Sequence, residues 1–356
     1  MFKDLLSFFA LSFLIFVHEL GHFLAGKILG ARVEEFGLGY PPRVWGKKVG
    51  ETLYSLNLVP FGGFTKFSAD DVGGIEIISG KSKPRRAVIL LAGVLGNFVL
   101  GWLILSLLFA TGNPTFVGQV VVSGVVPSSP AAEAGIREGE AILTLNGREM
   151  LLAEDLSYEV SKYLGQEVVL EVLSSDCVGG QEPFSAGCQR EVKVIPREVP
   201  PAGEGAMGVE VVLEGDMIEV TVPIWQAPLT AFGESLRLLR AMLAGYGMLL
   251  RSIVRERVVP EGLAGPVGVY GMAKAASGLG SAPFLQFLAF LSFGLGLFNL
   301  MPLPALDGGQ VLFVVVEALR GKRISANVGR WINLVGIGFL ILLMVSVTIQ
   351  DVRGLL

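Results

Sequence analysis

Four apolar stretches, each long enough to cross a lipid bilayer, constrain the fold of this chain more than any other feature. They cover residues 5–29, 87–110, 284–303 and 331–349, and a transmembrane helix needs about 20 apolar residues. The composition agrees, because 52% of the 356 residues are hydrophobic and 17% are charged. We therefore expect a polytopic α-helical membrane protein with four transmembrane helices in a lipid bilayer, and not a soluble enzyme.

The loops between these stretches predict how the chain crosses the membrane. Residues 27–86 carry 10 basic and 6 acidic side chains, and residues 320–330 carry 4 basic side chains and no acidic one. Cytoplasmic loops are enriched in Lys and Arg, so both loops should face the cytoplasm. Residues 113–282, with 12 basic and 21 acidic side chains, should then lie outside together with both termini. The net charge of −4 gives no reason to expect a nucleic-acid partner.

The outer segment has the pattern of a small domain built from short strands. Ser129 and Pro130 fit the start of a short helix, and Gly135 fits its end. Strands are expected at residues 141–145, 167–173 and 191–195, with a tight turn at Asn146-Gly147. Residues 229–253 predict a helix at the membrane interface or against the spans, because arginines interrupt their apolar face.

Residues 125–147 resemble the bacterial PDZ module, and residues 118–212 are long enough for one copy. A PDZ domain captures an extended peptide or a chain end at the edge of its sheet. We therefore expect a peptide or chain-end ligand, with residues 206–209 as the carboxylate-binding loop. The alternative is a small β-rich domain that only spaces or shields the membrane part. Cys177 and Cys188 could close one loop as a disulfide, which persists outside the cytoplasm.

The first apolar stretch carries the motif His18-Glu19-Leu20-Gly21-His22. The four-residue spacing places both imidazoles on one helix face, where they can bind one metal ion such as zinc. Glu19, beside the first histidine, is placed to act on water that such a metal activates. A purely structural pair of buried histidines is the alternative, but ionisable groups in a span are costly and usually functional. Cleavage near Ala25 as a signal peptide would remove both histidines, so we expect this stretch to be retained.

A catalytic zinc ion usually has three protein ligands, so the two histidines need a third. The chain has no other histidine, which leaves a carboxylate or a cysteine, and Asp307 is the only acid between residues 261 and 317. The prolines at positions 302 and 304 cannot continue a regular helix, and the glycines at 308 and 309 free the backbone beyond. An unwound segment could then present Asp307 to the interior, at the depth of both histidines. The alternative is that Asp307 only caps the next helix.

With these residues the chain resembles, over essentially its whole length, the bacterial site-2 proteases, intramembrane zinc metalloproteases of the type that regulates sigma factors. The specific marks are the histidine motif and Asn299-Leu-Met-Pro-Leu-Pro-Ala-Leu-Asp-Gly-Gly309. The weaker ones are Gly265-Pro-Val-Gly268, the PDZ-like insert between the second and third spans, and Gly93-Val-Leu-Gly-Asn97. The resemblance implies that His18, His22 and Asp307 bind zinc and that Glu19 is the catalytic acid and base. It also implies that Asn97, Asn299 and Pro302 line the path of a transmembrane protein substrate.

Two features depart from the family pattern. The family usually has proline directly after the first glycine of the second-span motif, where this chain has Val94. The best-known relatives often carry two tandem PDZ domains, whereas this chain has room for one.

The first cytoplasmic loop predicts a β-hairpin that re-enters the membrane beside the zinc. Residues 52–59 alternate between apolar and polar, and Pro60-Phe-Gly-Gly-Phe64 should turn the chain. Non-helical backbone at that depth needs cover from protein or water. Its edge could pair with an unwound substrate strand, and the family resemblance implies the same element. An ordinary solvated loop with a hairpin is the alternative.

The expected activity is hydrolysis of peptide bonds in or near transmembrane segments, for example of anti-sigma factors or signal-peptide remnants, at the bacterial cytoplasmic membrane. The resemblance gives the outer domain the role of a filter for trimmed substrates. Two other classes stay open, a non-catalytic PDZ scaffold with a structural metal and a metal or ion transporter.

The expected parts are a first span at 1–30, a cytoplasmic and re-entrant loop at 31–86, a second span at 87–112, a PDZ-like domain at 113–214, an interfacial helical region at 215–282, a third span with its unwound segment at 283–319, a cytoplasmic loop at 320–330 and a fourth span with the tail at 331–356.

Overall fold

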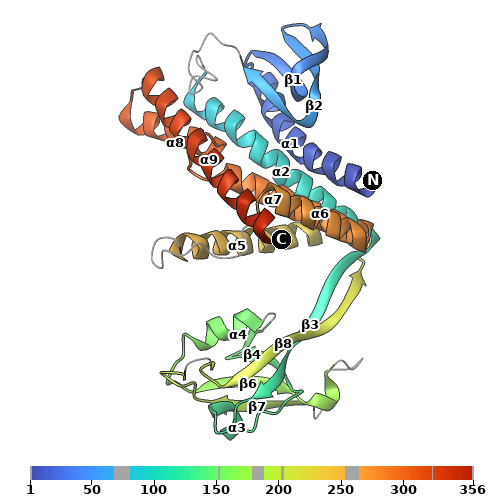
Figure 1. Ribbon diagram of the computed structural model, residues 1–356, viewed down its shortest axis with the longest axis vertical. Helices are drawn as coiled ribbons and strands as arrows, with labels where there is room; N and C mark the ends of the chain where they lie inside the picture. The colour runs from blue at the N-terminus through green and yellow to red at the C-terminus, as the bar shows by residue number, and fades with distance from the viewer. Residues whose placement is uncertain are drawn as a thin grey trace. The chain divides into compact units, whose positions relative to one another are not determined.

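The computed structural model describes residues 2–67, 81–150, 153–178, 188–201, 204–252, 264–322 and 324–354. The chain divides into two compact units (Figure 1). The first, called the membrane unit below, comprises Met1–Asn113 and Val220–Leu356. The second, called the inserted unit, comprises Pro114–Glu219. Each unit is described by itself.

The membrane unit contains the long apolar helices. Its helices are α1 (Phe2–Ile28), α2 (Lys83–Thr111), α5 (Ala227–Arg251), α6 (Pro266–Leu279), α7 (Ser281–Asn299), α8 (Asp307–Arg320) and α9 (Ala326–Gly354). Within the described part of the chain, four helical segments are long and apolar enough to cross a membrane: Ser7–Ile28, Lys83–Thr111, Ser281–Asn299 and Asn327–Arg353. These segments coincide with the four predicted spans, which confirms the expected fold class of a polytopic helical membrane protein with a β-rich part.

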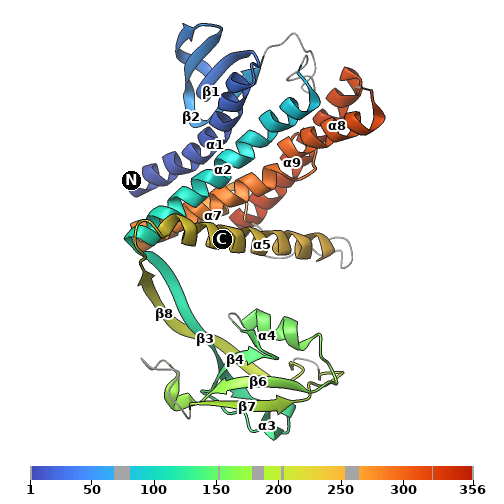
Figure 2. The ribbon, with the colours of Figure 1, turned by 180° about the vertical axis from the view of Figure 1, so that it is seen from behind.

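Helix α2 lies at the centre of the membrane unit, against α1, α5, α7 and α8 (Figure 2). Small residues bring the helices close together: a Cβ atom on Gly21 would lie 2.8 Å from the carbonyl carbon of Ala92, and one on Gly296 would lie 2.7 Å from the ring of Phe98. In lipid, helices associate by close packing because the hydrophobic effect does not drive them together. The helix also continues unbroken through Val94, where the family usually has proline.

Helix α5 has the character predicted for residues 229–253. It is not among the candidate spans of the described residues, and it lies across the other helices of the unit (Figure 1). Its first turns bury Ala227 and Ala231 against Leu108 and Phe109 of α2. The other side leaves large apolar side chains such as Phe232 exposed, as expected for an interfacial helix.

Strands β1 (Val33–Val49) and β2 (Thr52–Phe67) form the sheet of the membrane unit. Gly37 of β1 pairs with both Ser55 and Phe64, so β2 folds back on itself between these two residues. This reversal is the turn predicted at Pro60–Phe64, and Gly62 adopts the left-handed conformation there, with φ of 67°. The backbone N–H of Gly62 donates to Oγ of Ser12 at 2.6 Å, which holds the turn against α1.

Two polar contacts join helices that are far apart in the sequence. Nη1 of Arg86 in α2 lies 2.6 Å from Oε2 of Glu317 in α8, and both side chains are less than 10% exposed. The carboxylate of Asp351 in α9 accepts hydrogen bonds from the backbone N–H groups of Gly265 (3.1 Å) and Gly268 (2.8 Å) at the start of α6. A Cβ atom on Gly268 would lie 2.9 Å from Oδ1 of Asp351, so the weakly marked Gly265–Gly268 motif provides space for this carboxylate.

The inserted unit is built on one six-stranded sheet. Its elements are β3 (Asn113–Val125), α3 (Pro130–Glu133), β4 (Ala141–Leu145), β5 (Arg148–Glu149), α4 (Ala153–Val160), β6 (Val168–Leu173), β7 (Gln189–Val194) and β8 (Val209–Val220). The strand order is β7-β6-β4-β3-β8, with β5 paired to β4. The three predicted strands correspond to β4, β6 and β7. Their inward side chains, including Ile142, Leu170 and Val192, form the core with α3 and α4.

Local signals in the inserted unit act as the sequence predicts. Oγ of Ser129 accepts a hydrogen bond from the N–H of Ala132 at 3.2 Å and so caps α3. Asn146 and Gly147 have φ of 50° and 77°, the conformation of a type I′ hairpin turn. The N–H of Ala131 donates to the carbonyl of Met207, so residues 206–209 lie beside α3.

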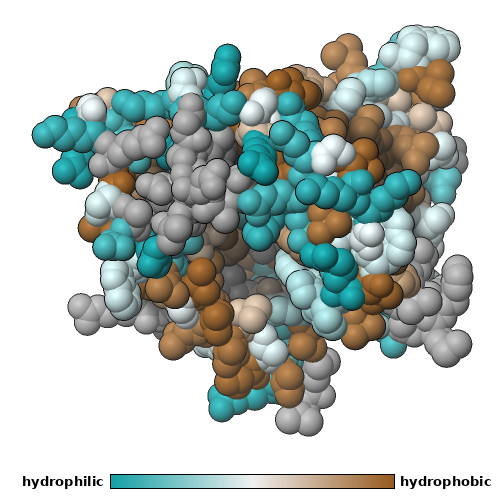
Figure 3. Space-filling model, turned by 90° about the horizontal axis from the view of Figure 1, so that it is seen from above, coloured by the Kyte–Doolittle hydropathy of each residue, from teal (hydrophilic) through white to brown (hydrophobic). Residues whose placement is uncertain are grey.

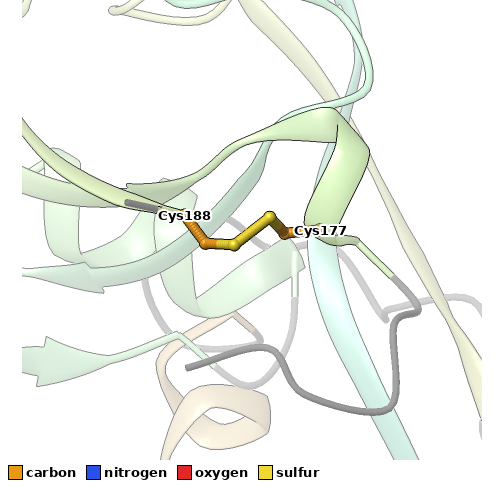
Figure 4. Close-up of a disulfide and its surroundings, with 2 residues drawn as sticks. All are labelled: Cys177 and Cys188. Carbon is orange, nitrogen blue, oxygen red and sulfur yellow. A yellow bond between two sulfur atoms is a disulfide. The ribbon is translucent and has the colours of Figure 1, made fainter. Parts of the chain in front are cut away.

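Cys177 and Cys188, 11 positions apart in the sequence, form a disulfide that closes the loop between them (Figure 4). Replacing both by serine is expected to lower the stability of the inserted unit by about 3 kcal/mol, because the open loop gains conformational freedom in the unfolded chain. Calorimetry on the full chain in detergent measures this loss, and wild-type protein treated with a reductant is the matched control. Equal stability of the wild type, the reduced protein and the double variant would contradict the prediction.

Candidate metal centre

The two histidines of the motif lie in the second half of α1, with their rings in an edge-to-face arrangement. Nε2 of His18 and Nε2 of His22 are 3.2 Å apart, and both residues are buried. Nδ1 of His22 lies 2.9 Å from the carbonyl oxygen of Ile89 in α2. A carbonyl can only accept, so Nδ1 of His22 carries the proton and Nε2 keeps its lone pair free for a metal.

Asp307 reaches the histidines because the chain between α7 and α8 is not helical. Helix α7 ends at Asn299 and α8 begins at Asp307, so the predicted interruption by the two prolines is present. Ala305 has φ of 75°, a left-handed turn immediately before α8. The prediction that Gly308 and Gly309 free the backbone after the prolines is wrong, because both lie within α8 and neither has a left-handed backbone. A Cβ atom on either would instead collide with the carbonyl groups of Leu300 or Leu303, so these glycines give the returning chain room.

Three potential ligand atoms converge at this place. Oδ2 of Asp307 lies 2.9 Å from Nε2 of His18 and 3.3 Å from Nε2 of His22. The same oxygen is buried and makes no hydrogen bond of acceptable geometry within the described residues. Two ligand atoms held by a tetrahedral zinc ion at its usual bond lengths lie about 3.3 Å apart. The three atoms therefore fit one side of a zinc coordination sphere and leave its fourth position open.

Gly93 of α2 lies directly against this group of atoms. A Cβ atom at Gly93 would collide with Nε2 of His22 and would lie 2.8 Å from Nε2 of His18. The glycine is therefore a close-approach residue of the metal centre, a role that the sequence reasoning missed. The sequence did indicate this role, because Gly93 lies four residues before Asn97. That spacing places both residues on the same face of α2, which can then contact the site beside α1.

Glu19 has a position that suits chemistry beside the metal. Its carboxylate is partly buried and close enough to interact electrostatically with His22, His18 and Asp307. The hydroxyl of Thr65 in β2 donates to the backbone carbonyl of Glu19 at 2.9 Å. The last segment of β2 therefore lies beside the turn of α1 that carries the motif.

The three residues predicted to line the substrate path lie in different settings. Asn97 is fully buried, and its side-chain amide lies 3.2 Å from Nδ1 of His18. Asn299 is partly buried and donates to the carbonyl of Leu295 in its own helix. Pro302 is exposed in the segment between α7 and α8. A substrate-binding role for these residues stays a prediction.

Comparison with known proteins agrees with this geometry. The sequence profile of peptidase family M50 matches residues 6–343. A candidate zinc metalloprotease of Clostridium perfringens is 33% identical over 347 residues, which cover 96% of each chain. Zinc metalloprotease RasP of Shouchella clausii is 27% identical over 99% of each chain, and the regulator of sigma-W protease RasP of Bacillus subtilis is 26% identical over 96% of each.

The match covers nearly the whole described chain, including both segments that bring the three ligand atoms together. The expected enzyme class and the expected zinc cofactor are thereby confirmed. The chain belongs to peptidase family M50 and is a multi-pass membrane zinc metalloprotease.

Proposed function

We propose that this protein hydrolyses peptide bonds in or near the transmembrane segments of other membrane proteins, with zinc held by His18, His22 and Asp307 and with Glu19 as the acid and base. The observation that carries the proposal is the convergence of the three ligand atoms, two of them on a helix long enough to span a membrane. A metal site on a helix that can span a membrane suits peptide bonds in or near membrane-spanning segments.

A bound zinc ion, Glu19 and His22 have different roles in the proposed reaction. A bound zinc ion supplies a lowered pKa for water and polarisation of the scissile carbonyl. Glu19, one residue from the first ligand, accepts the proton of the attacking water and delivers it to the nitrogen of the leaving amine. His22 presents Nε2 to the metal because the carbonyl of Ile89 holds the proton on Nδ1 and so fixes the tautomer of the ring.

The sheet of the membrane unit supports an unwound substrate. A helical peptide bond is shielded by its own hydrogen bonds, so cleavage requires an extended segment. The last segment of β2 lies beside the motif through Thr65, where its edge can pair with such a segment. Asn299 and Pro302, in and after the last turn of α7, are assigned to the same substrate path.

The orientation proposed for the chain places the metal centre toward the cytoplasm of a bacterial cell and the inserted unit outside. The basic loops support this orientation. Figure 3, which looks onto the hairpin end of the membrane unit, shows hydrophilic side chains gathered there. The Cys177–Cys188 disulfide supports an oxidising compartment for the inserted unit. That unit acts as a PDZ-like filter, which binds a peptide or chain end and admits substrates whose outer part has been trimmed.

The name of one relative supports a narrower class of substrate. One relative is named a regulator of sigma-W protease, and we assign anti-sigma factors and signal-peptide remnants as candidate substrates.

Glu19→Gln tests the proposal. Cleavage of a labelled model transmembrane peptide in detergent should fall by about 10² to 10⁴-fold, while the zinc content per chain stays that of the wild type. Glu234→Gln, at a partly buried position of α5 in an ion pair with Arg237, is the matched control and should cleave normally. A Glu19→Gln variant with full activity would contradict the proposal and would favour a scaffold or a transporter.

A further inference from the structure

We propose that Asn97 is a positioning residue of the metal centre: its side-chain oxygen accepts the Nδ1 proton of His18 and so directs Nε2 of His18 at the zinc. This inference rests on the zinc site proposed above. It assigns to Asn97 a role different from the substrate contact that the family resemblance implies.

The contacts of Asn97 indicate that its side-chain amide is hydrogen-bonded to His18. The residue is 0% exposed. One end of its amide lies 3.2 Å from Nδ1 of His18, and Oδ1, at the other end, is buried without a hydrogen-bond partner among the described residues. The two ends of an amide have nearly the same shape, so the hydrogen-bond network decides which end is the oxygen.

The metal geometry decides the orientation of the amide. Nε2 of His18 converges with Nε2 of His22 and Oδ2 of Asp307, so Nε2 must carry the free lone pair. A neutral imidazole then carries its proton on Nδ1, and this proton needs an acceptor. Oδ1 of Asn97 turned toward His18 is that acceptor. The same rotation gives a donor to this oxygen, which otherwise lies buried without a hydrogen-bond partner among the described residues.

Helix α2 provides a hydrogen-bond partner for Nδ1 of each histidine. Nδ1 of His22 is held by the carbonyl of Ile89, and Nδ1 of His18 is held by Asn97, about two helical turns further along α2. From α7, the hydroxyl of Ser292 donates to the backbone carbonyl of Asn97 at 2.8 Å and holds that turn of α2. Metal-bound histidines usually donate their second nitrogen to such an acceptor, which fixes the ring and its tautomer.

Two variants of similar size separate this role from packing. Asn97→Asp retains an acceptor and should bind zinc within a few-fold of the wild type. Asn97→Leu fills the space but accepts no hydrogen bond, so its zinc affinity should fall by about 10 to 100-fold, the usual effect of losing such a partner. The measurement is the zinc dissociation constant of the full chain in detergent, by competition with a chelator. The absorption spectrum of the cobalt-substituted protein reports the ligand geometry independently of activity.

Three outcomes would overturn the proposal: wild-type zinc affinity in Asn97→Leu, equal losses in both variants, or a loss of tenfold or more in Asn97→Asp. If the leucine variant does not fold, the aspartate variant alone decides. Failure of the zinc site itself has a different signature, because the wild-type chain would then bind no zinc, whereas here only the leucine variant should lose affinity.

Discussion

Replacing Asp307 by alanine is expected to remove zinc from the protein and to abolish peptide-bond cleavage. Two histidines alone leave the metal without its third ligand and without the only negative charge among the three ligand atoms. Because the metal provides both the activated water and the polarised carbonyl, the rate should fall by about 10⁶-fold or more, toward that of the uncatalysed reaction. Metal analysis of the purified protein and cleavage of the model transmembrane peptide measure the two losses.

Asp351→Asn is the matched control for this experiment. Asp351 is also an aspartate at the end of a helix in the membrane unit, but its carboxylate binds the first turn of α6. Its variant should keep one zinc ion per chain. Unchanged zinc content and turnover in Asp307→Ala would show that the third ligand is another residue.

The second large effect is expected at Gly93, a residue without a side-chain functional group. In Gly93→Ala the new methyl group would occupy space now taken by the imidazole of His22, and it would also crowd Nε2 of His18. Neither ring can move freely, because each is held at Nδ1 by α2. Displacement of a ligand by about 1 Å typically costs a hundredfold, so zinc affinity and cleavage should each fall by about that factor or more.

Gly294→Ala provides the comparison for Gly93→Ala. Gly294 also lies in an apolar helix, α7, but a Cβ atom there would meet no atom within 4 Å. This variant should bind zinc and cleave the peptide as the wild type does. If the two alanine variants behave alike, Gly93 has no special relation to the metal centre.

The candidate site could be predicted largely from local patterns in the sequence. The spacing of His18 and His22 is set by the helical repeat. Asp307 stood out because no other acid occurs in that part of the chain and because prolines precede it. The fold was accessible for the same reason, since a membrane span has to be apolar along its whole length.

The contacts that support the site could not be predicted in this way. Asn97 and His18 are 79 residues apart, and Arg86 and Glu317 are 231 residues apart. Such pairs depend on which helix faces meet, and all faces of an apolar span look alike in sequence. The space that Gly308 and Gly309 provide is likewise set by the path of the chain after α7, which the sequence indicates only as an interruption.

The way the chain enters and leaves the inserted unit has a consequence for how such proteins diversify. It enters through β3 and leaves through β8, and these strands are hydrogen-bonded neighbours in one sheet. A module whose two ends lie next to each other can be duplicated, exchanged or shortened without moving the helices that it interrupts. Evolution can thus alter the inserted unit while the hydrolytic machinery is inherited unchanged.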